Sequence, residues 1–280
     1  MAAALVSAAG TVAAATPAAQ VSSRPVGAHR QAIEIAALGP RPAGGGAELR
    51  AHRVVGASFR RAGLEVRVQR FPVPGRGRSR NVIGVHHTHG SCLRIVMAHT
   101  DTTPAGPGAN DNASGVGLVM TLARRLPRLG SSCDVWLVAT GAEERVTTGS
   151  PDHLGALALV KAVRRRRLAR RLDWALSLDE VGRGRDFWLR SPAARARPHV
   201  EGALLRAARR ERAPVTWVRD EGTGNSDHRE FELAGLPAMK LGAGAAGEPC
   251  RHTACDVAAR LEGGAFSRAR RTTERALRAR

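Results

Sequence analysis

The chain contains no tyrosine, and aromatic residues make up only 3% of its 280 positions. Proteins that bind single-stranded nucleic acid stack bases on aromatic side chains, so this composition argues against such a function. The sequence has no run of about 20 strongly apolar residues, which argues against a membrane-spanning helix. It also has no Gly-x-Ser-x-Gly motif, so a serine hydrolase of the α/β class would have no nucleophile.

Lysine is nearly absent, although the chain is strongly basic. The sequence has 44 Lys and Arg against 24 Asp and Glu, a net charge of +20, but lysine occurs only at Lys161 and Lys240. An arginine excess together with abundant alanine and glycine is typical of a GC-rich coding sequence. Nucleic-acid-binding proteins instead gather basic residues on one face. We therefore interpret the charge as compositional bias and expect the densest basic run, residues 164–171, to be a solvated helix end.

The length and the hydrophobic content indicate one substantial domain. With 43% hydrophobic residues in 280, the chain can bury a sizeable core. Residues 1–28 are rich in alanine, and we expect a leader or a disordered tail there, followed by a single catalytic domain at 29–280. The first 20 residues contain small-residue stretches like a signal-peptide cleavage site but lack a basic start and a strong apolar centre. The chain is therefore expected to be secreted or extracytoplasmic, with a cytoplasmic location left open.

Strand-like and helix-like segments alternate along the chain. Apolar residues recur at helical spacing in residues 48–62 and 114–126, a further helix is expected to begin near residue 153, and a terminal helix after residue 258. Strand-like runs cover residues 64–71, 81–87, 93–98 and 135–139, and another ends near residue 178. This alternation predicts an α/β fold with a largely parallel central sheet, flanked by helices and carrying its functional residues at the strand ends.

Candidate metal-binding side chains follow three of these strand-like runs. His99 follows residues 93–98, Glu144 follows residues 135–139, and Asp179 follows the run that ends near residue 178. Two loops add Asp111 and His252, so the candidate ligands are two imidazoles and three carboxylates. Zinc accepts nitrogen and carboxylate oxygen, and a two-metal site needs one carboxylate that bridges ions about 3.5–4 Å apart. These residues therefore predict a divalent-metal site, most simply two zinc ions.

The candidate general base is Glu143, which precedes the candidate ligand Glu144. A bound metal lowers the pKa of its water toward about 7, and a neighbouring carboxylate can then take the water's proton. One carboxylate of the adjacent pair could thus bind metal while the other transfers protons.

In combination and order, these motifs resemble the M28 family of zinc peptidases, which includes secreted bacterial aminopeptidases and, as relatives, the glutaminyl cyclases. The resemblance runs from about Ala32 to Val257. Its motifs are His-x-Asp, Pro-Gly-Ala-Asn-Asp-Asn-x-Ser-Gly, Gly-Ala-Glu-Glu, Leu-Asp, Ser-Asp-His-x-x-Phe and His-Thr-x-x-Asp. It implies a three-layer zinc-exopeptidase fold whose sheet is mixed. It also implies an aminopeptidase that acts on the N-termini of peptides or small proteins.

The resemblance further assigns roles to the residues of these motifs. His99, Glu144, Asp179 and His252 would each bind one or the other metal ion, Asp111 would bridge the two ions, and Glu143 would be the general base. Asp101 would orient the imidazole of His99 through a hydrogen bond, which fixes its tautomer. Asp227, in Ser-Asp-His, would line the site without binding metal.

Arg251 is the main departure from the family pattern. In many of these aminopeptidases a tyrosine precedes the last histidine ligand and donates a hydrogen bond to the developing oxyanion. This chain has Arg251 before His252. A guanidinium offers several donors and a permanent positive charge, so Arg251 is a candidate replacement for that oxyanion donor.

The four cysteines bear on the compartment. In secreted bacterial members of the family, cysteines spaced like Cys250 and Cys255 form a small disulfide loop around the histidine ligand, which would imply an oxidising environment here. The alternatives are two free thiols, or a structural zinc bound by both cysteines and His252. Cys92 and Cys133 each precede a strand-like run. They are expected to be buried free thiols, or a second bridge if those strands are neighbours.

Two other functions stay open at this point. A single-zinc acyltransferase that cyclises N-terminal glutamine would bind one zinc instead of two, and a binding module would keep the fold without the chemistry. The sequence indicates neither the preferred substrate side chain nor the oligomeric state.

Two motif-like segments are rejected. Adjacent histidines within residues 86–89 would point to opposite faces of a strand end, so they do not predict a metal site. The Gly-x-Gly-x-x-Gly match at residues 242–247 is followed by Glu248-Pro249 instead of a helix, so we expect a loop over 241–249 instead of a dinucleotide site.

Overall fold

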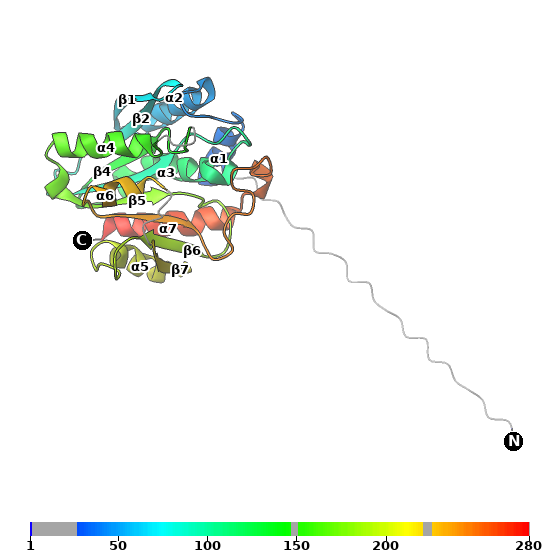
Figure 1. Cartoon of the computed structure of the whole chain (residues 1–280). Coiled ribbons are helices and arrows are strands. Elements are labelled where there is room, and N and C mark those ends of the chain that lie inside the picture. Colours follow the sequence, from blue (N-terminus) through cyan, green and yellow to red (C-terminus); the bar gives the residue numbers. More distant parts are fainter. Residues whose placement is uncertain (2–26, 147–150, 221–225, 280) are drawn as a thin grey trace.

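The central element of the fold is a mixed sheet between two layers of helices (Figure 1). The computed structural model describes residues 1, 27–146, 151–220 and 226–279. Most of the alanine-rich segment, the predicted leader or tail, lies outside the described residues. Among the helices of the described ranges, none has the length and hydropathy needed to cross a membrane.

The elements that the structure describes are short and regular. The strands are β1 (Glu65–Val73), β2 (Gly77–His86), β3 (Leu93–His99), β4 (Asp134–Thr140), β5 (Leu172–Leu178), β6 (Phe187–Ser191), β7 (Val215–Arg219) and β8 (Ala238–Ala243). The α-helices are α1 (Ala28–Ala36), α2 (Gly46–Arg61), α3 (Ser114–Arg125), α4 (Leu154–Arg165), α5 (Glu201–Arg210), α6 (His228–Leu233) and α7 (Gly263–Arg278).

The centre of the sheet is parallel and its edges are mixed. Within the described residues, the strand order is β1-β2-β4-β3-β5-β8-β6-β7. The four strands β4, β3, β5 and β8 pair in parallel, whereas β2 is antiparallel to both β1 and β4, and β6 is antiparallel to β8. The predicted class, a mixed and largely parallel sheet flanked by helices, is confirmed. Because parallel strands end at the same edge, the ends of β3, β4 and β5 lie together.

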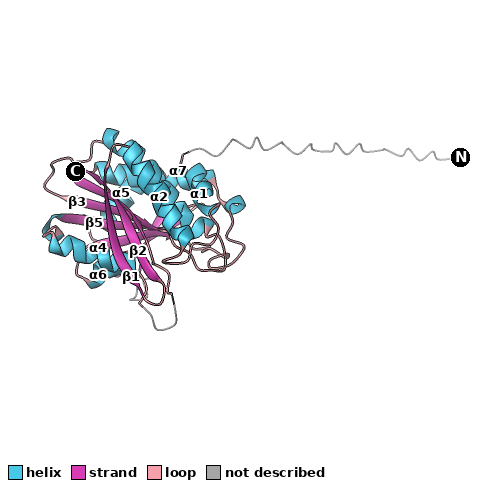
Figure 2. Cartoon of the chain, turned by 90° about the horizontal axis from the view of Figure 1, so that it is seen from above, coloured by secondary structure: helices cyan, strands magenta, loops and turns pink. Residues whose placement is uncertain are grey.

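Side chains of the central strands point alternately to the two faces of the sheet, and both faces carry apolar core residues. On β3, Val96 and Ala98 pack into the cluster formed with α1, α2, α3, α5 and α7, whereas Ile95 and Met97 pack against α4 and α6. All four side chains are fully buried. Figure 2 shows α4 and α6 on one side of the strands and α1, α2 and α7 on the other. A continuous apolar run is what a strand covered on both faces requires.

The segments with clear periodicity form the expected elements, within a few residues at their ends. The predicted helices correspond to α2, α3, α4 and α7. No clear sequence pattern marked β6, α5, β7 and α6. For the two strands the reason is that each has only five residues and that β7 is partly exposed along its length. The predicted loop over 241–249 begins only after Ala243, since Leu241 is a buried residue of β8.

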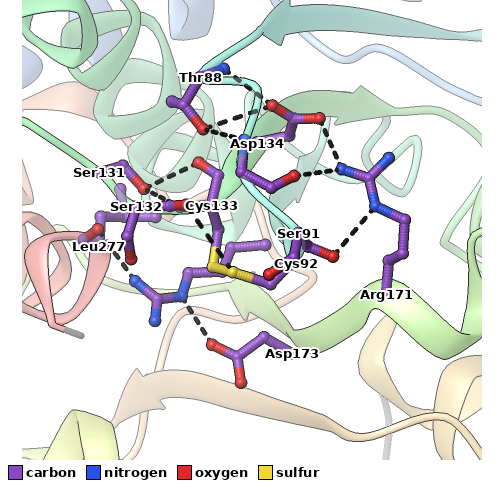
Figure 3. Close-up of a disulfide and its surroundings, with 12 residues drawn as sticks. Thr88, Ser91, Cys92, Ser131, Ser132, Cys133, Asp134, Arg171, Asp173 and Leu277 are labelled. Carbon is purple, nitrogen blue, oxygen red and sulfur yellow. Dashed lines mark hydrogen bonds and ion pairs between the residues drawn. A yellow bond between two sulfur atoms is a disulfide. The ribbon is translucent and has the colours of Figure 1, made fainter.

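A disulfide joins Cys92 and Cys133 at the start of two central strands (Figure 3). The strands β3 and β4 are parallel neighbours in which Leu93 pairs with Asp134, so the residues just before them also face each other, with Cα atoms 4.7 Å apart. The bridge, one of the two options left open by the sequence, is therefore the one observed. Free thiols at these positions are a wrong expectation, because strand pairing brings the two sulfurs together.

A buried histidine next to the site predicts acid sensitivity. His52 of α2 lies with its Nε2 2.7 Å from Thr100 Oγ1, and burial lowers the pKa of His52 to about 4. Since its pKa in the unfolded chain is higher, near 6.5, the stability it contributes is complete above pH 6.5 and is lost as the pH falls through 4. That difference corresponds to about 3 kcal/mol.

We expect His52→Gln, which keeps a polar partner for Thr100 but cannot become charged, to lose about 3 kcal/mol less stability than the wild type between pH 6.5 and pH 4. Urea unfolding of both proteins at each pH, with a chelator present so that metal loss does not contribute, measures this difference. Equal losses in the two proteins would contradict the assignment to His52.

Candidate active site

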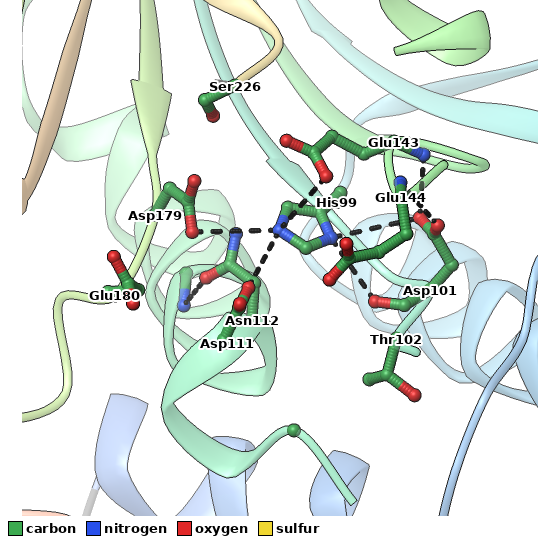
Figure 4. Close-up of polar contacts among 12 residues, drawn as sticks. His99, Asp101, Thr102, Asp111, Asn112, Glu143, Glu144, Asp179, Glu180 and Ser226 are labelled. Atoms are coloured by element: carbon green, nitrogen blue, oxygen red, sulfur yellow. Dashed lines mark hydrogen bonds and ion pairs between the residues drawn. The ribbon is translucent and has the colours of Figure 1, made fainter. Parts of the chain in front are cut away.

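The candidate ligands meet at the carboxyl edge of the sheet, and Figure 4 shows four of the five, His99, Asp111, Glu144 and Asp179. His99 is the last residue of β3, Asp179 directly follows β5, and Glu143 and Glu144 follow β4 by three and four residues. Asp111 precedes α3, and His252 comes from a loop between β8 and α7. Residues separated by more than 150 positions thus share one site, as the strand-end pattern predicted.

Asp111 lies between two groups of ligand atoms. Its Oδ1 is 3.2 Å from His99 Nε2, which is also 3.6 Å from Asp179 Oδ1. Its Oδ2 is 3.2 Å from His252 Nε2, which is also 3.0 Å from Glu144 Oε1. Each group therefore contains one imidazole, one terminal carboxylate and one oxygen of the shared Asp111.

The spacing of these atoms fits zinc. Tetrahedral zinc with ligand bonds of roughly 2.0–2.2 Å places neighbouring ligand atoms about 3.4 Å apart. The observed separations of 3.0–3.6 Å are close to that value, and the donors are the nitrogen and carboxylate oxygen that zinc prefers. His86, His87 and His89 belong to none of the clusters of metal-binding side chains found among the described residues.

The loop with His252 also holds Asp111 in place. Cys250 and Cys255 form a disulfide around His252, and the next residue, Asp256, accepts hydrogen bonds from the backbone N–H groups of Asn110 and Asp111, at 2.7 and 2.9 Å. The disulfide excludes both free thiols and a structural zinc at these cysteines. The sequence signal for Asp256 was its place in His-Thr-x-x-Asp, but its contact with the Asp111 backbone could not be read from that motif.

Asp101 organises the ends of two strands. Its carboxylate accepts hydrogen bonds from the backbone N–H groups of Glu143 and Glu144, at 3.0 and 2.9 Å. The Nδ1 of His99 lies 3.2 Å from the backbone carbonyl oxygen of Asp101 and 3.7 Å from its carboxylate. The carbonyl is thus the nearer partner of the imidazole, and the carboxylate mainly fixes the backbone of the Glu143–Glu144 pair.

Two further residues support this edge: Gly141 belongs to the Gly-Ala-Glu-Glu motif, whereas no function was assigned to Arg41 from the sequence. Arg41 is fully buried and donates to the carbonyl oxygens of Thr100 and Pro107, at 2.8 and 2.7 Å. Gly141 lies so close to its neighbours that a Cβ atom would be 2.3 Å from Ser79 Oγ, which explains why glycine is required at position 141. Arg41 thus holds the segment that follows β3, and Gly141 allows the segment that follows β4 to pack closely against β2.

The site carries excess negative charge that favours cations. Burial, with repulsion from Glu144 and Asp179, raises the pKa of Glu143 well above its usual value. Hydrogen bonds to Asp111 and Glu144 raise the pKa of His252 to about 10. Glu143 and His252 therefore hold their protons more strongly than usual. Metal ions would replace those protons, because metal binding requires a neutral imidazole and ionised carboxylates.

Two cations lie beside Asp179. The ammonium of Lys240 on β8 is fully buried and lies 2.7 Å from Asp179 Oδ2, and the pKa of Asp179 falls well below its usual value because Lys240 and His99 outweigh the effect of burial. Arg251 donates through Nε and a terminal nitrogen to both oxygens of Glu180, at 2.7 Å for Nε. The sequence did not indicate Lys240 or Glu180 as site residues.

Asp227 lies behind the site. It is fully buried, and its Oδ2 accepts a hydrogen bond from Thr140 Oγ1 at 2.5 Å, while burial raises its pKa to about 6. A cavity of about 160 Å³ opens over the candidate ligands. Among the described residues its lining is Asp111, Glu143, Glu144, Arg145, Asp152, His153, Asp179, Lys240, Arg251 and His252, and it does not include Asp227.

Comparison with known families agrees with this geometry. The model of peptidase family M28 matches residues 81–277, more than half of the chain. The chain belongs to peptidase family M28. The matched region contains all five candidate ligands and Glu143, so the resemblance read from the motifs is confirmed.

Curated relatives of this M28 chain are named as aminopeptidases. It is 34% identical over 183 residues to the probable lipoprotein aminopeptidase LpqL of Mycobacterium tuberculosis, covering 60% of this chain and 35% of that protein. It is 36% identical over 90 residues to aminopeptidase YwaD of Bacillus subtilis, covering 30% of this chain and 20% of that protein. The chain thus spans about a third or less of the length of these relatives.

Solved structures share the fold at lower identity. A zinc aminopeptidase of Bacillus subtilis superposes with a TM-score of 0.77 at 18% identity, covering 89% of this chain and 93% of that structure. A glutaminyl cyclase of Fimbriiglobus ruber has a TM-score of 0.79 at 20% identity, covering 90% and 94%. The M28 fold by itself therefore does not separate peptide hydrolysis from glutamine cyclisation.

Proposed function

We propose that this M28 protein is a zinc-dependent aminopeptidase that hydrolyses the first peptide bond of peptides or small proteins. The observation that carries the proposal is Asp111, whose two oxygens each face a separate imidazole at 3.2 Å. A carboxylate in that position is suited to bridge two ions, and such a pair clamps the attacking and leaving groups of a hydrolysis. The names of the curated relatives support the same activity.

The two groups of ligand atoms would hold two zinc ions. His99 and Asp179 would bind one ion, Glu144 and His252 the other, and Asp111 would contact both. Bound zinc supplies a Lewis acid that polarises the scissile carbonyl and lowers the pKa of water. The protein's own contribution is to fix these donors and to move protons.

Glu143 is placed to move those protons. Its Oε2 lies 4.0 Å from His99 Nε2, farther than the oxygens of Asp111 and Asp179 at 3.2 and 3.6 Å, and it borders the cavity. As general base it would take one proton from the attacking water, whose oxygen bonds to the carbonyl carbon. It would then pass that proton to the amine nitrogen as the carbon–nitrogen bond breaks.

The size of the cavity supports action at a free N-terminus. Because the cavity is small, about 160 Å³, it suits a chain end more than the middle of a long peptide.

Arg251 would assist at the oxyanion. Two of its nitrogens are engaged by Glu180, and its side chain remains 35% exposed at the cavity. We expect Arg251→Ala to lower kcat by about 10²–10³-fold with little change in KM or zinc content, because one donor to the developing charge is lost. Steady-state kinetics on a good substrate measures this. A variant with wild-type kcat would limit Arg251 to its ion pair.

The two disulfides and the name of one relative support an extracytoplasmic location. Disulfides persist in oxidising compartments and are rare in the reducing cytosol. Both pairs, Cys92–Cys133 and Cys250–Cys255, are formed, and one curated relative is named a lipoprotein. We therefore propose that the protein acts outside the cytoplasm.

A single-zinc glutaminyl cyclase is the second candidate. The observation that favours it is Lys240, which already neutralises Asp179 at 2.7 Å and leaves the His99 group with less negative charge for a metal ion. Metal content separates the two functions, because the aminopeptidase requires two zinc ions per chain and the cyclase one. Its direct assay would be cyclisation of a glutaminyl peptide, monitored through the ammonia that the reaction releases.

The experiment that tests the proposal is hydrolysis of a panel of chromogenic aminoacyl amides. The purified protein is stripped with a chelator and then restored with zinc. Cleavage that disappears on stripping and returns with zinc would support the aminopeptidase and would reveal its preferred side chain. No cleavage of any amide by protein that holds two zinc ions would overturn it.

A further inference from the structure

His153 is a cavity residue to which the sequence assigned no function. It immediately precedes α4, and its backbone N–H donates to the carbonyl oxygen of Glu143 at 2.8 Å. Its side chain is only 3% exposed, yet it borders the cavity over the candidate ligands. A buried imidazole at this point can act on whatever its two nitrogens face.

The two ring nitrogens of His153 face two different carboxylates. Its Nε2 lies 3.5 Å from Glu143 Oε1, and its Nδ1 lies 3.1 Å from Glu230 Oε1 on α6. Asp152 is farther from Nδ1, at 3.8 Å. The side chains therefore form a line, Glu230 to His153 to Glu143, that ends at the candidate general base.

The two oxygens of Glu143 thus have separate surroundings. While Oε1 is near His153, Oε2 is directed to the metal-ligand group, 4.0 Å from His99 Nε2. A glutamate carboxylate rotates broadly about its last bond, and the side chain has several staggered conformers about its other bonds. A partner on one oxygen reduces this freedom, so the other oxygen keeps its direction toward the His99 group.

The same cluster does not suit a further metal ion. Asp152, His153 and Glu230 have ligand atoms within 4.8 Å of one another. However, Arg229 lies 3.5 Å from Asp152 and 3.7 Å from Glu230, and Arg145 lies 2.9 Å from Asp152. These guanidinium groups already supply the positive charge that a metal would bring. The carboxylates of Asp152 and Glu230 are therefore better suited to orient the imidazole of His153 than to bind a further metal ion.

We propose that His153 is a positioning residue that holds Glu143 Oε1, so that Oε2 stays directed at the metal centre, and that Glu230 fixes the orientation of the His153 ring. The arrangement matches the way carboxylates orient imidazoles around metal sites, where loss of such a partner costs about 10–100-fold in metal affinity or activity. The inference rests on the proposed role of Glu143 as general base.

Three variants separate positioning from packing. His153→Phe keeps a planar ring of similar size but has no nitrogen to face Glu143. His153→Gln places an amide nitrogen near the position of Nε2 and so keeps a donor to Glu143. Glu230→Gln removes the charge that orients the imidazole, and the exposed His199→Phe is the matched control.

The readouts are kcat, KM, zinc content and melting temperature of each full-length zinc protein, with the best amide of the panel. We expect His153→Phe to lower kcat by about 10–100-fold with KM and zinc content close to wild type. His153→Gln should recover most of that loss, and Glu230→Gln should show a smaller loss of the same kind. A purely structural role would lower the melting temperature without this separation of kcat from KM and without rescue by glutamine.

Wild-type kcat in His153→Phe, or equal losses in His153→Phe and His153→Gln, would overturn the inference. If His153→Phe does not fold, Glu230→Gln decides, because wild-type kcat in that variant would also overturn it. A wild-type protein that binds zinc but cleaves no amide would overturn the proposed function itself. An active wild type with an unaffected His153→Phe overturns only the role of His153.

Discussion

Glu143→Gln is expected to keep its zinc and to lose about 10²–10⁴-fold in kcat, the range that general acid–base catalysis contributes. The amide has nearly the shape of the carboxylate but cannot accept the water's proton. Glu143 is not one of the five proposed ligands, so the variant should keep the proposed ligand set intact. Amide hydrolysis and zinc content, measured on the same preparation, check both parts of the expectation.

The control for this variant is Glu34→Gln on the exposed face of α1, which should behave as wild type. Turnover retained in Glu143→Gln would contradict the assignment of the base. Loss of zinc from Glu143→Gln would contradict it in a different way, because Glu143 would then be a metal ligand. The two failures are separated by the metal measurement.

Asp111→Ala is expected to lose zinc from both groups of ligands and to abolish activity. Each oxygen of Asp111 faces a different imidazole, so its removal takes one donor from each half of the site at once. A carboxylate shared by two cations would also reduce the repulsion between them. Zinc per chain, measured after dialysis against a weak chelator, should fall well below the wild-type value.

Asp173→Ala is the matched control, since Asp173 is a partly exposed partner of Arg94 at the far end of β5. It should keep full zinc content. Full occupancy of both groups in Asp111→Ala would contradict the bridging role. Loss of one zinc with the other retained would show that Asp111 belongs to one group alone.

Three of the five candidate ligands could be predicted because each follows a recognisable strand-like run. His99, Glu144 and Asp179 come at or after the apolar runs that became β3, β4 and β5. Runs buried on both faces are easily recognised, and parallel strands bring their carboxyl ends to one edge. The short β6, β7 and α6 were missed, because five or six residues with mixed burial carry too little periodicity.

The sequence alone determined the class of the fold, the chemical identity of the metal donors and the adjacent Glu143–Glu144 pair. Only the tertiary structure decided which oxygen of Asp111 faces which imidazole, which cysteine joins Cys92, and that Lys240 and His153 lie beside the site. The physical reason is that a motif is local, whereas charge interactions and hydrogen bonds depend on distance and burial. Lys240 and Asp179, 61 positions apart, come within 2.7 Å because β5 and β8 are paired strands.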